Sequence, residues 1–178
     1  MITRMIVVTG TRRAGTSMWM QILETAGFDC IGEAFPADWR ETIGGANPGG
    51  FYESMLRHGV YYRTNPNPET GEYVHPEQVA KHVVKIFIPG LVRSDLSYLQ
   101  RVLATVRPWR DYARSVQRMQ IMEQEARGHD APIPQLPAAM EWWESNFKLV
   151  GDLAMRGYPC HVQAYEEVLA RPRETIEA

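Results

Sequence analysis

Short apolar runs alternate along this chain with longer stretches in which apolar residues recur every three or four positions. Most of the short runs are apolar at successive positions, as in strands buried on both faces of a sheet. They predict strands at 5–9, 83–88, 102–106 and 160–164. The longer stretches have the period of amphipathic helices. They predict helices at 17–26, 94–100, 109–126, 138–156 and 166–170, with a shorter one near 53–60 and another beginning at Pro172.

Glycine and proline divide these elements. Gly27 is expected to end the first helix, Pro89 with Gly90 the second strand, and Pro108 to open helix 109–126. Three segments lack either period and are rich in polar, Gly or Pro residues. They are 28–50, expected to be irregular, 63–76, expected to be a surface loop, and 127–137, expected to be a mobile connection or lid.

Strands that alternate with helices predict an α/β fold, with a parallel sheet flanked by helices. Gly10 and Arg107 each follow a predicted strand directly, so both are expected at the carboxyl edge of the sheet, where such folds bind ligands. A length of 178 residues suits one domain, 1–178. The last helix is cut short at Ala178, which predicts a truncated C-terminus or a small family member.

Composition and charge narrow the function classes. The chain is 44% hydrophobic and 22% charged, as in an ordinary globular protein, and its net charge of −2 argues against nucleic acid as a partner. No apolar run approaches the ~20 residues of a membrane span, and the first strand leaves no room for a signal peptide. Cys30 and Cys160 lack metal-ligand spacing and suit reduced thiols, so the expected location is the cytoplasm, away from membranes.

The segment from Gly10 to Ser17, Gly-Thr-Arg-Arg-Ala-Gly-Thr-Ser, lies between the first predicted strand and helix. Backbone N–H groups in such a loop, together with the helix dipole, favour an anion. The spacing is that of a phosphate-binding P-loop, G-x-x-x-x-G-K-[ST], but Thr16 replaces the Lys that reaches nucleotide phosphates. This replacement argues against an ordinary ATPase or kinase, and Arg12 and Arg13 favour a different, strongly anionic group. The alternative is a plain strand–helix turn with Ser17 as the N-cap.

Three segments resemble sulfotransferases that use 3′-phosphoadenosine 5′-phosphosulfate (PAPS), as in the small bacterial or phage-type members. Residues 12–17 resemble the loop that binds the 5′-phosphosulfate. Arg107 and Ser115 have the eight-residue spacing of the family's 3′-phosphate site, with Pro108 between them. Residues 164–172, Ala-Tyr-Glu-Glu-Val-Leu-Ala-Arg-Pro, resemble the late Tyr-Glu-[DE]-Leu-x-x-x-Pro segment. The matches occur in the family's order and span nearly the whole chain.

The resemblance implies a P-loop-containing, nucleotide-kinase-like sulfotransferase fold and transfer of a sulfuryl group to a small-molecule or carbohydrate acceptor. The accepting group would be a hydroxyl or, less favoured, an amine, with 3′-phosphoadenosine 5′-phosphate (PAP) as product and no metal required. The implied cofactor-binding residues are Arg12, Arg13, Ala14, Gly15, Thr16 and Ser17 for the 5′-phosphosulfate, and Arg107 and Ser115 for the 3′-phosphate. The chain departs from the family where Arg12 replaces Pro, where Ala14 replaces Ser or Gly, and where an adenine-clamping C-terminal region has no counterpart.

The reaction also needs a base for the acceptor and a cation near the sulfuryl group. Many members place a Glu about twenty residues after the loop Arg, and Glu33 follows Arg13 by that distance, so Glu33 is the first candidate. Glu53, in Gly-Gly-Phe-Tyr-Glu, is the second candidate and His58 the third. Arg13 falls where the family contacts the transferred group. Lys85 resembles a family Lys near the sulfuryl group, and the alternative is a strand residue that points to solvent.

Two other functions stay open at this point. One is a P-loop kinase for a nucleotide or small molecule, and the other is a PAP-binding protein without catalysis. The acceptor and the oligomeric state have no signature in the sequence. Aromatic residues of the irregular region are candidates either for an acceptor pocket or for a packed loop: Trp39, Phe51, Tyr52, Tyr61 and Tyr62.

Overall fold

The computed structural model describes residues 5–61, 79–128 and 136–177, without the side chain of Arg127. Its five strands form one sheet in the order β2-β3-β1-β4-β5, and every neighbouring pair is parallel. The strands are β1 (Ile6–Gly10), β2 (Asp29–Ile31), β3 (His82–Lys85), β4 (Val102–Val106) and β5 (Cys160–Ala164). The predicted α/β class with a parallel sheet is confirmed.

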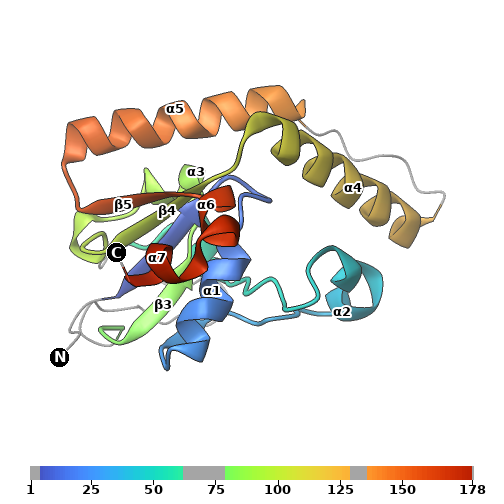
Figure 1. The fold of residues 1–178 in the computed structure, drawn as a ribbon, viewed down its shortest axis with the longest axis horizontal. Coiled ribbons are helices and arrows are strands. Elements are labelled where there is room, and N and C mark those ends of the chain that lie inside the picture. Colours follow the sequence, from blue (N-terminus) through green and yellow to red (C-terminus); the bar gives the residue numbers. More distant parts are fainter. Residues whose placement is uncertain (1–4, 62–78, 129–135, 178) are drawn as a thin grey trace.

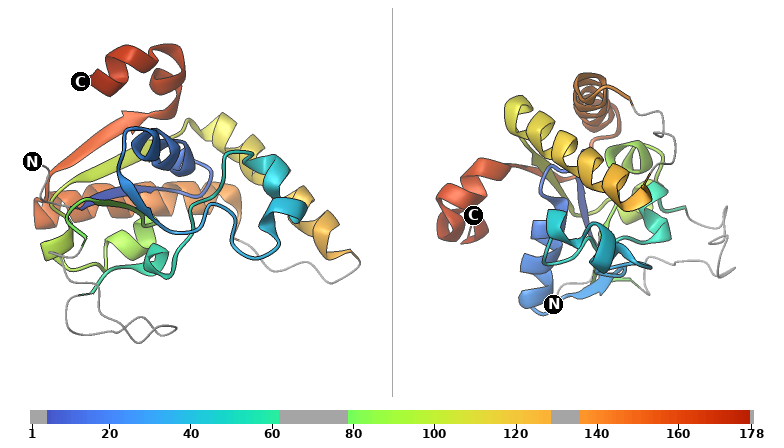
Figure 2. Two further views of the ribbon diagram at one scale, coloured as in Figure 1. Left: turned by 90° about the horizontal axis from the view of Figure 1, so that it is seen from below. Right: turned by 90° about the vertical axis from the view of Figure 1, so that its right-hand side faces the viewer.

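Helices cover both faces of the sheet (Figures 1 and 2). One face carries α1 (Thr16–Thr25), and the other carries α3 (Ile88–Leu91) and α5 (Ala138–Arg156). Helix α4 (Trp109–Arg127) leaves the end of β4 and extends beyond the sheet toward α2 (Trp39–Thr42). The remaining helical segments are α6 (Tyr165–Ala170), α7 (Pro172–Glu177) and the 3₁₀ turns Gly44–Ala46, Met55–His58 and Leu96–Tyr98.

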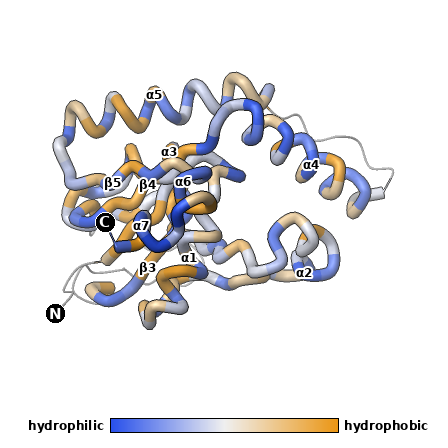
Figure 3. The backbone as a smooth tube through the Cα atoms, in the orientation of Figure 1, coloured by the Kyte–Doolittle hydropathy of each residue, from blue (hydrophilic) through white to orange (hydrophobic). Residues whose placement is uncertain are grey.

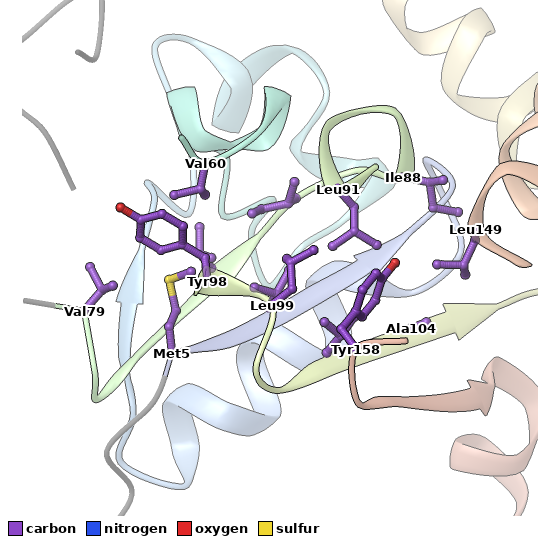
Figure 4. Packing of buried hydrophobic residues seen from close by; sticks show 14 residues of the cluster. Met5, Val60, Val79, Ile88, Leu91, Tyr98, Leu99, Ala104, Leu149 and Tyr158 are labelled. Atoms are coloured by element: carbon purple, nitrogen blue, oxygen red, sulfur yellow. The ribbon is translucent and has the colours of Figure 1, made fainter. Parts of the chain in front are cut away.

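Two apolar clusters, one on each face, hold these layers together. Val7 and Val8 are successive residues of β1 and point to opposite faces, so each joins a different cluster. The larger cluster lies under α3 and α5 and includes Leu91, Leu149 and Tyr158 (Figure 4). The smaller cluster packs beneath α1. Burial on both faces explains why β1 and β3 have the continuous apolar runs from which the sequence predicted them.

The structure corrects two predicted elements. The region 28–50 is not wholly irregular, because Asp29–Ile31 forms edge strand β2 beside β3. The second predicted strand ends at Lys85, and Ile88–Leu91 forms a helical turn instead. Pro89 lies in the first turn of that helix, where proline fits, so it opens a helix rather than stopping a strand.

The helices predicted at 94–100 and near 53–60 are only the 3₁₀ turns Leu96–Tyr98 and Met55–His58. The other helix ends differ from the predictions by one residue at most, and α4 continues to Arg127. The predicted loop at 63–76 and Tyr62 lie outside the described residues, as does most of the predicted lid at 127–137. In the described parts of the chain, no helix is both long and apolar enough to cross a membrane.

Candidate functional site

The loop between β1 and α1 is built on left-handed backbone. Arg13 has φ 63° and Gly15 has φ 101°, and the Ala14 N–H turns back to donate to the Thr11 carbonyl at 3.2 Å. Left-handed residues of this kind also occur in anion-binding nests. Helix α1 begins at Thr16, and the N–H groups of its first turn have no intrahelical acceptor. These N–H groups lie where the sequence predicts that an anion binds.

Close contacts explain why glycine occupies both ends of this loop. A Cβ on Gly10 would lie 2.7 Å from the Thr105 carbonyl oxygen, and one on Gly15 would lie 2.4 Å from Cδ2 of Tyr165. The Thr105 hydroxyl also donates to the Ala14 carbonyl at 2.9 Å, which ties the loop to β4. Tyr165 of the late Tyr-Glu segment thus packs against the loop.

Arg13 connects the loop to α4 and to the irregular region. Its Nε donates to the Ser115 hydroxyl at 3.1 Å, and its guanidinium donates to the Ala46 carbonyl at 2.8 Å. Burial and the nearby cation of Arg107 lower the pKa of Arg13 from its ordinary value. Arg13 therefore lies beside Arg107 and Ser115, the pair expected to bind the 3′-phosphate.

Arg107 meets the same loop from the end of β4. Its guanidinium donates to the Arg13 carbonyl at 3.1 Å and lies 4.5 Å from the centre of the Tyr165 ring. Trp142 of α5 donates to the Arg107 carbonyl at 2.9 Å, which fixes the backbone of this residue. Within the described residues, Nε of Arg107 is buried without a hydrogen-bond acceptor. A ligand oxygen would satisfy that donor.

Arg12 points toward the opposite wall and pairs with α5. Its Nε and guanidinium nitrogen donate to the two oxygens of Glu141 at 3.0 and 3.2 Å. The Glu141 hydrogen bond raises the pKa of Arg12 against the lowering effect of burial. Sequence reasoning missed Glu141, because 129 residues separate the partners and nothing local marks a helical Glu as a partner for the loop.

Lys85 does not point to solvent, so that alternative is wrong. Its side chain is 2% exposed and its Nζ lies 2.6 Å from Oε1 of Glu53, which is 8% exposed. Nζ also donates to the Phe51 carbonyl and lies 3.5 Å from the Ser17 hydroxyl. Burial lowers the pKa of Lys85, and the neighbouring Glu53 opposes that effect. A buried cation thus lies beside the first turn of α1.

The candidate bases occupy different environments. Glu33 and Glu53 exchange both backbone hydrogen bonds, at 2.9 and 3.0 Å, so the two residues are neighbours. The Glu33 side chain is exposed and does not line the cavity described below, whereas Glu53 does. His58 is exposed, and its Nε2 accepts from Nε of Arg57 at 3.0 Å. Partial burial and the Arg57 cation lower the pKa of His58.

Two adjoining cavities open at this edge of the sheet. The first, about 320 Å³, lies between the loop, α4 and the irregular region. The second, about 460 Å³, lies between the loop, α3 and α5. They share four lining residues, Arg12, Arg57, His58 and Phe87. The first contains Lys85, Glu53 and the loop, and the second contains Arg93 and Lys148.

The aromatic candidates divide between the pocket and the core. Trp39 and Phe51 line the first cavity and meet edge to face, with ring centroids 5.1 Å apart. Tyr52 is buried in the cluster under α1 and donates to Glu24, so it is a packing residue. In the part of the chain that is described, no three His, Cys, Asp or Glu side chains gather as a metal site.

Comparisons with models of protein families, with curated proteins and with solved structures found no match for this chain. The geometry above and the quoted motifs therefore carry the functional argument.

Proposed function

We propose that this protein is a PAPS-dependent sulfotransferase with a P-loop-type sulfotransferase fold. One observation carries the proposal: Arg107 and Ser115, eight residues apart, both contact Arg13 of the loop. The two sites that we propose for phosphate groups, at the loop and at this pair, would thereby adjoin each other. PAPS has a negatively charged group for each site, the 5′-phosphosulfate for the loop and the 3′-phosphate for Arg107 and Ser115. ATP has no 3′-phosphate.

Charge complementarity supports the cofactor assignment. The loop N–H groups, Thr16 and Ser17 would hold the 5′-phosphosulfate, and the Arg107 guanidinium with the Ser115 hydroxyl would hold the 3′-phosphate through charge-assisted hydrogen bonds. In the transfer, the acceptor oxygen bonds to sulfur as the bond from sulfur to the phosphate oxygen breaks. Negative charge then gathers on the departing phosphate, close to the loop.

Lys85 is the residue best suited to stabilise the transferred group. It lies in the first cavity beside Ser17, and in that low-dielectric position its charge acts more strongly than it would in water. Glu53 holds the ammonium in place through the 2.6 Å contact. Arg13, the expected contact for this group, is directed instead toward Ser115. We therefore assign the sulfuryl-side cation to Lys85 and the 3′-phosphate side to Arg13.

The proposal also orders the candidate bases. Glu53 lines the cavity beside Lys85, and its second carboxylate oxygen is buried without a hydrogen-bond donor among the described residues. That oxygen, which lies 3.6 Å from the Arg57 guanidinium, is the one we assign to accept a proton from an acceptor hydroxyl. Glu33, the first candidate from spacing, supports Glu53 through the backbone. The second cavity, which shares His58 with the first, provides the approach for the acceptor.

The test is a calorimetric titration of the full chain with PAP, and separately with ATP and Mg²⁺. Binding of PAP with no response to ATP supports the proposal and justifies an acceptor screen with radiolabelled PAPS. Binding of ATP alone would overturn it and favour the kinase alternative. Binding of PAP without transfer to any acceptor in the screen would leave a PAP-binding protein instead of an enzyme.

A second measurement separates the bases. We expect Glu33→Gln to retain both PAP affinity and sulfuryl transfer, because the exposed side chain does not line the cavity. Glu53→Gln is expected to retain PAP affinity and lose transfer by about 10²- to 10⁴-fold, the usual contribution of a general base. Loss of transfer in Glu33→Gln with full activity in Glu53→Gln would reverse the assignment.

A further inference from the structure

Helix α5 exposes an apolar face between Met140 and Val150. Leu136, just before the helix, and Met140, Trp143, Phe147 and Val150 are each 55 to 66% exposed. With 3.6 residues per turn, the four positions inside the helix fall within an arc of about 80°. The opposite side of α5 is already used, since Leu149 is buried in the core against the sheet. The helix thus has two apolar faces, and only one of them is covered within the described chain.

The exposed face has the composition of a protein interface. Trp143 and Phe147 stack with ring centroids 5.3 Å apart, and Trp143 meets Trp142 edge to face at 5.0 Å. Aromatic residues and Met are enriched in the buried centres of interfaces, and rigid aromatic side chains dominate their energetics. Helix α5 is also the outermost layer on its side of the sheet, with hydrophobic positions recurring along it (Figures 1 and 3). A partner could therefore approach without displacing any other element of the described residues.

The charges beside this face are self-complementary. Glu144 and Lys148 form an ion pair on one flank of the apolar stripe, and both side chains are about half exposed. If two copies of α5 pack antiparallel about a two-fold axis near Phe147, this flank of one helix faces the same flank of the other. Glu144 of each copy then lies close to Lys148 of its partner. In a parallel pair, the charged flank would instead face the uncharged flank that contains Asn146.

Side-chain size fits the same arrangement. An axis at Phe147 places Trp143 of one copy opposite Gly151 of the other, because the two residues lie four positions to either side. A Cβ built on Gly151 meets no atom within 4 Å, so this position is open to a large side chain from outside. We propose that the protein forms an antiparallel homodimer through the outer faces of α5, with Phe147 at the two-fold axis.

The available area sets the strength of this dimer. A 19-residue helix is about 28 Å long, and one face of it presents on the order of 500 Å². Two copies would bury about 1,000 Å², at the lower limit of specific interfaces. We therefore expect a reversible dimer with a dissociation constant in the micromolar range. The proposal does not rest on the sulfotransferase assignment, although Leu136, Glu144 and Lys148 also line the second cavity.

The first experiment is sedimentation velocity over protein concentrations from about 1 to 200 µM, in the range set by that affinity. The wild type is expected to shift from 20.3 kDa toward twice that mass. Phe147→Glu places two like charges at the axis and should raise the dissociation constant at least about 30-fold. Ile121→Glu is the matched control, because Ile121 is 51% exposed and lies on α4, away from this face. This variant should dimerise as the wild type does.

The second experiment tests the antiparallel register. Glu144→Lys and Lys148→Glu should each weaken the dimer at low salt, and the double charge reversal should restore it. A wild type that stays monomeric to 200 µM, or a dimer unaffected by Phe147→Glu, would overturn the proposal. Failure of the double variant to recover would overturn the antiparallel arrangement. A monomer that binds phosphatidylglycerol vesicles would assign the face to a lipid surface instead.

Discussion

The buried pair of Lys85 and Glu53 gives the sharpest test of the site's construction. The perturbation is to replace Lys85 with Met and Glu53 with Gln, singly and together. Either single change leaves one member of the pair in a nearly water-free position, since the side chains are only 2% and 8% exposed. Losing one partner of a buried ion pair costs about 3–5 kcal/mol, because the remaining charge is uncompensated.

Partial compensation places the expected loss at the lower end of this range. After Lys85→Met, Arg57 still lies 3.6 Å from the second oxygen of Glu53. After Glu53→Gln, Lys85 can still donate to the Phe51 carbonyl. We therefore expect about 3 kcal/mol for each single variant. For a chain of this length, that corresponds to a fall in Tm of roughly 6–12 °C.

The double variant removes both charges and leaves no buried ion, so it should be more stable than either single variant. The assay is thermal and urea unfolding followed by circular dichroism. Lys81→Met is the matched control, because Lys81 is an exposed lysine just before β3 and should change stability by less than about 0.5 kcal/mol. A loss below about 1 kcal/mol for Lys85→Met, or a double variant less stable than both singles, would refute the reasoning.

The same pair predicts a pH dependence. Burial lowers the pKa of Lys85 in the folded protein, so the unfolded chain binds more protons between that lowered value and about 10.5. Stability of the wild type relative to Lys85→Met should therefore rise with pH across this window. A relative stability that falls over the same range would mean that the folded state favours the charged lysine.

Three further predictions concern Arg107, Gly15 of the loop and the thiol of Cys30. In calorimetry, Arg107→Ala should weaken the binding of PAP far more than the binding of adenosine 5′-phosphosulfate. The control Arg110→Ala, at a nearby exposed position, should change neither affinity. Equal losses of affinity for the two ligands would show that Arg107 does not bind the 3′-phosphate. Gly15→Ala should destabilise the fold by at least about 1 kcal/mol, because the new Cβ would lie 2.4 Å from a ring carbon of Tyr165. Gly151→Ala is the control in the same unfolding assay. Its Cβ would meet no atom, so it should stabilise α5 by up to about 1 kcal/mol. Burial raises the pKa of Cys30 from 9.0 to about 11. Alkylation of this thiol with iodoacetamide at pH 8 should therefore be about 100-fold slower in the native protein than in denaturant. Equal alkylation rates would contradict the raised pKa.

The fold was predictable where periodicity was long or where an apolar run was buried on both faces. Strand β4 and helix α5 match their predicted bounds for this reason. Strand β2 was missed because it has only three residues, all of them partly exposed, at the sheet edge. The end of β3 was misjudged because the apolar run continues through Ile88, where tertiary packing buries a helical turn instead of a strand.

The site was predictable where chemistry follows local spacing. The loop and Arg107 each follow a strand at one sheet edge, and Ser115 lies in the second turn of α4, the helix that begins just after Arg107, so the three meet there. The partners of the loop cations were not predictable in this way. Glu141 reaches Arg12 across 129 residues, and the Ala46 carbonyl reaches Arg13 through an irregular segment with no period. Such contacts depend on how α4 and α5 pack, which no short motif encodes.

The different partners of the two loop arginines divide their roles. Both bonds from Arg13 go to neutral oxygens, the Ser115 hydroxyl and the Ala46 carbonyl. A phosphate oxygen would replace either with a stronger, charge-assisted bond, so Arg13 is ready to exchange partners when an anion enters. Arg12 is held at both nitrogens by the Glu141 carboxylate, and an incoming anion would have to break an ion pair of equal kind. Arg13 is therefore suited to bind the ligand, while Arg12 joins the loop to α5 and forms the wall between the two cavities.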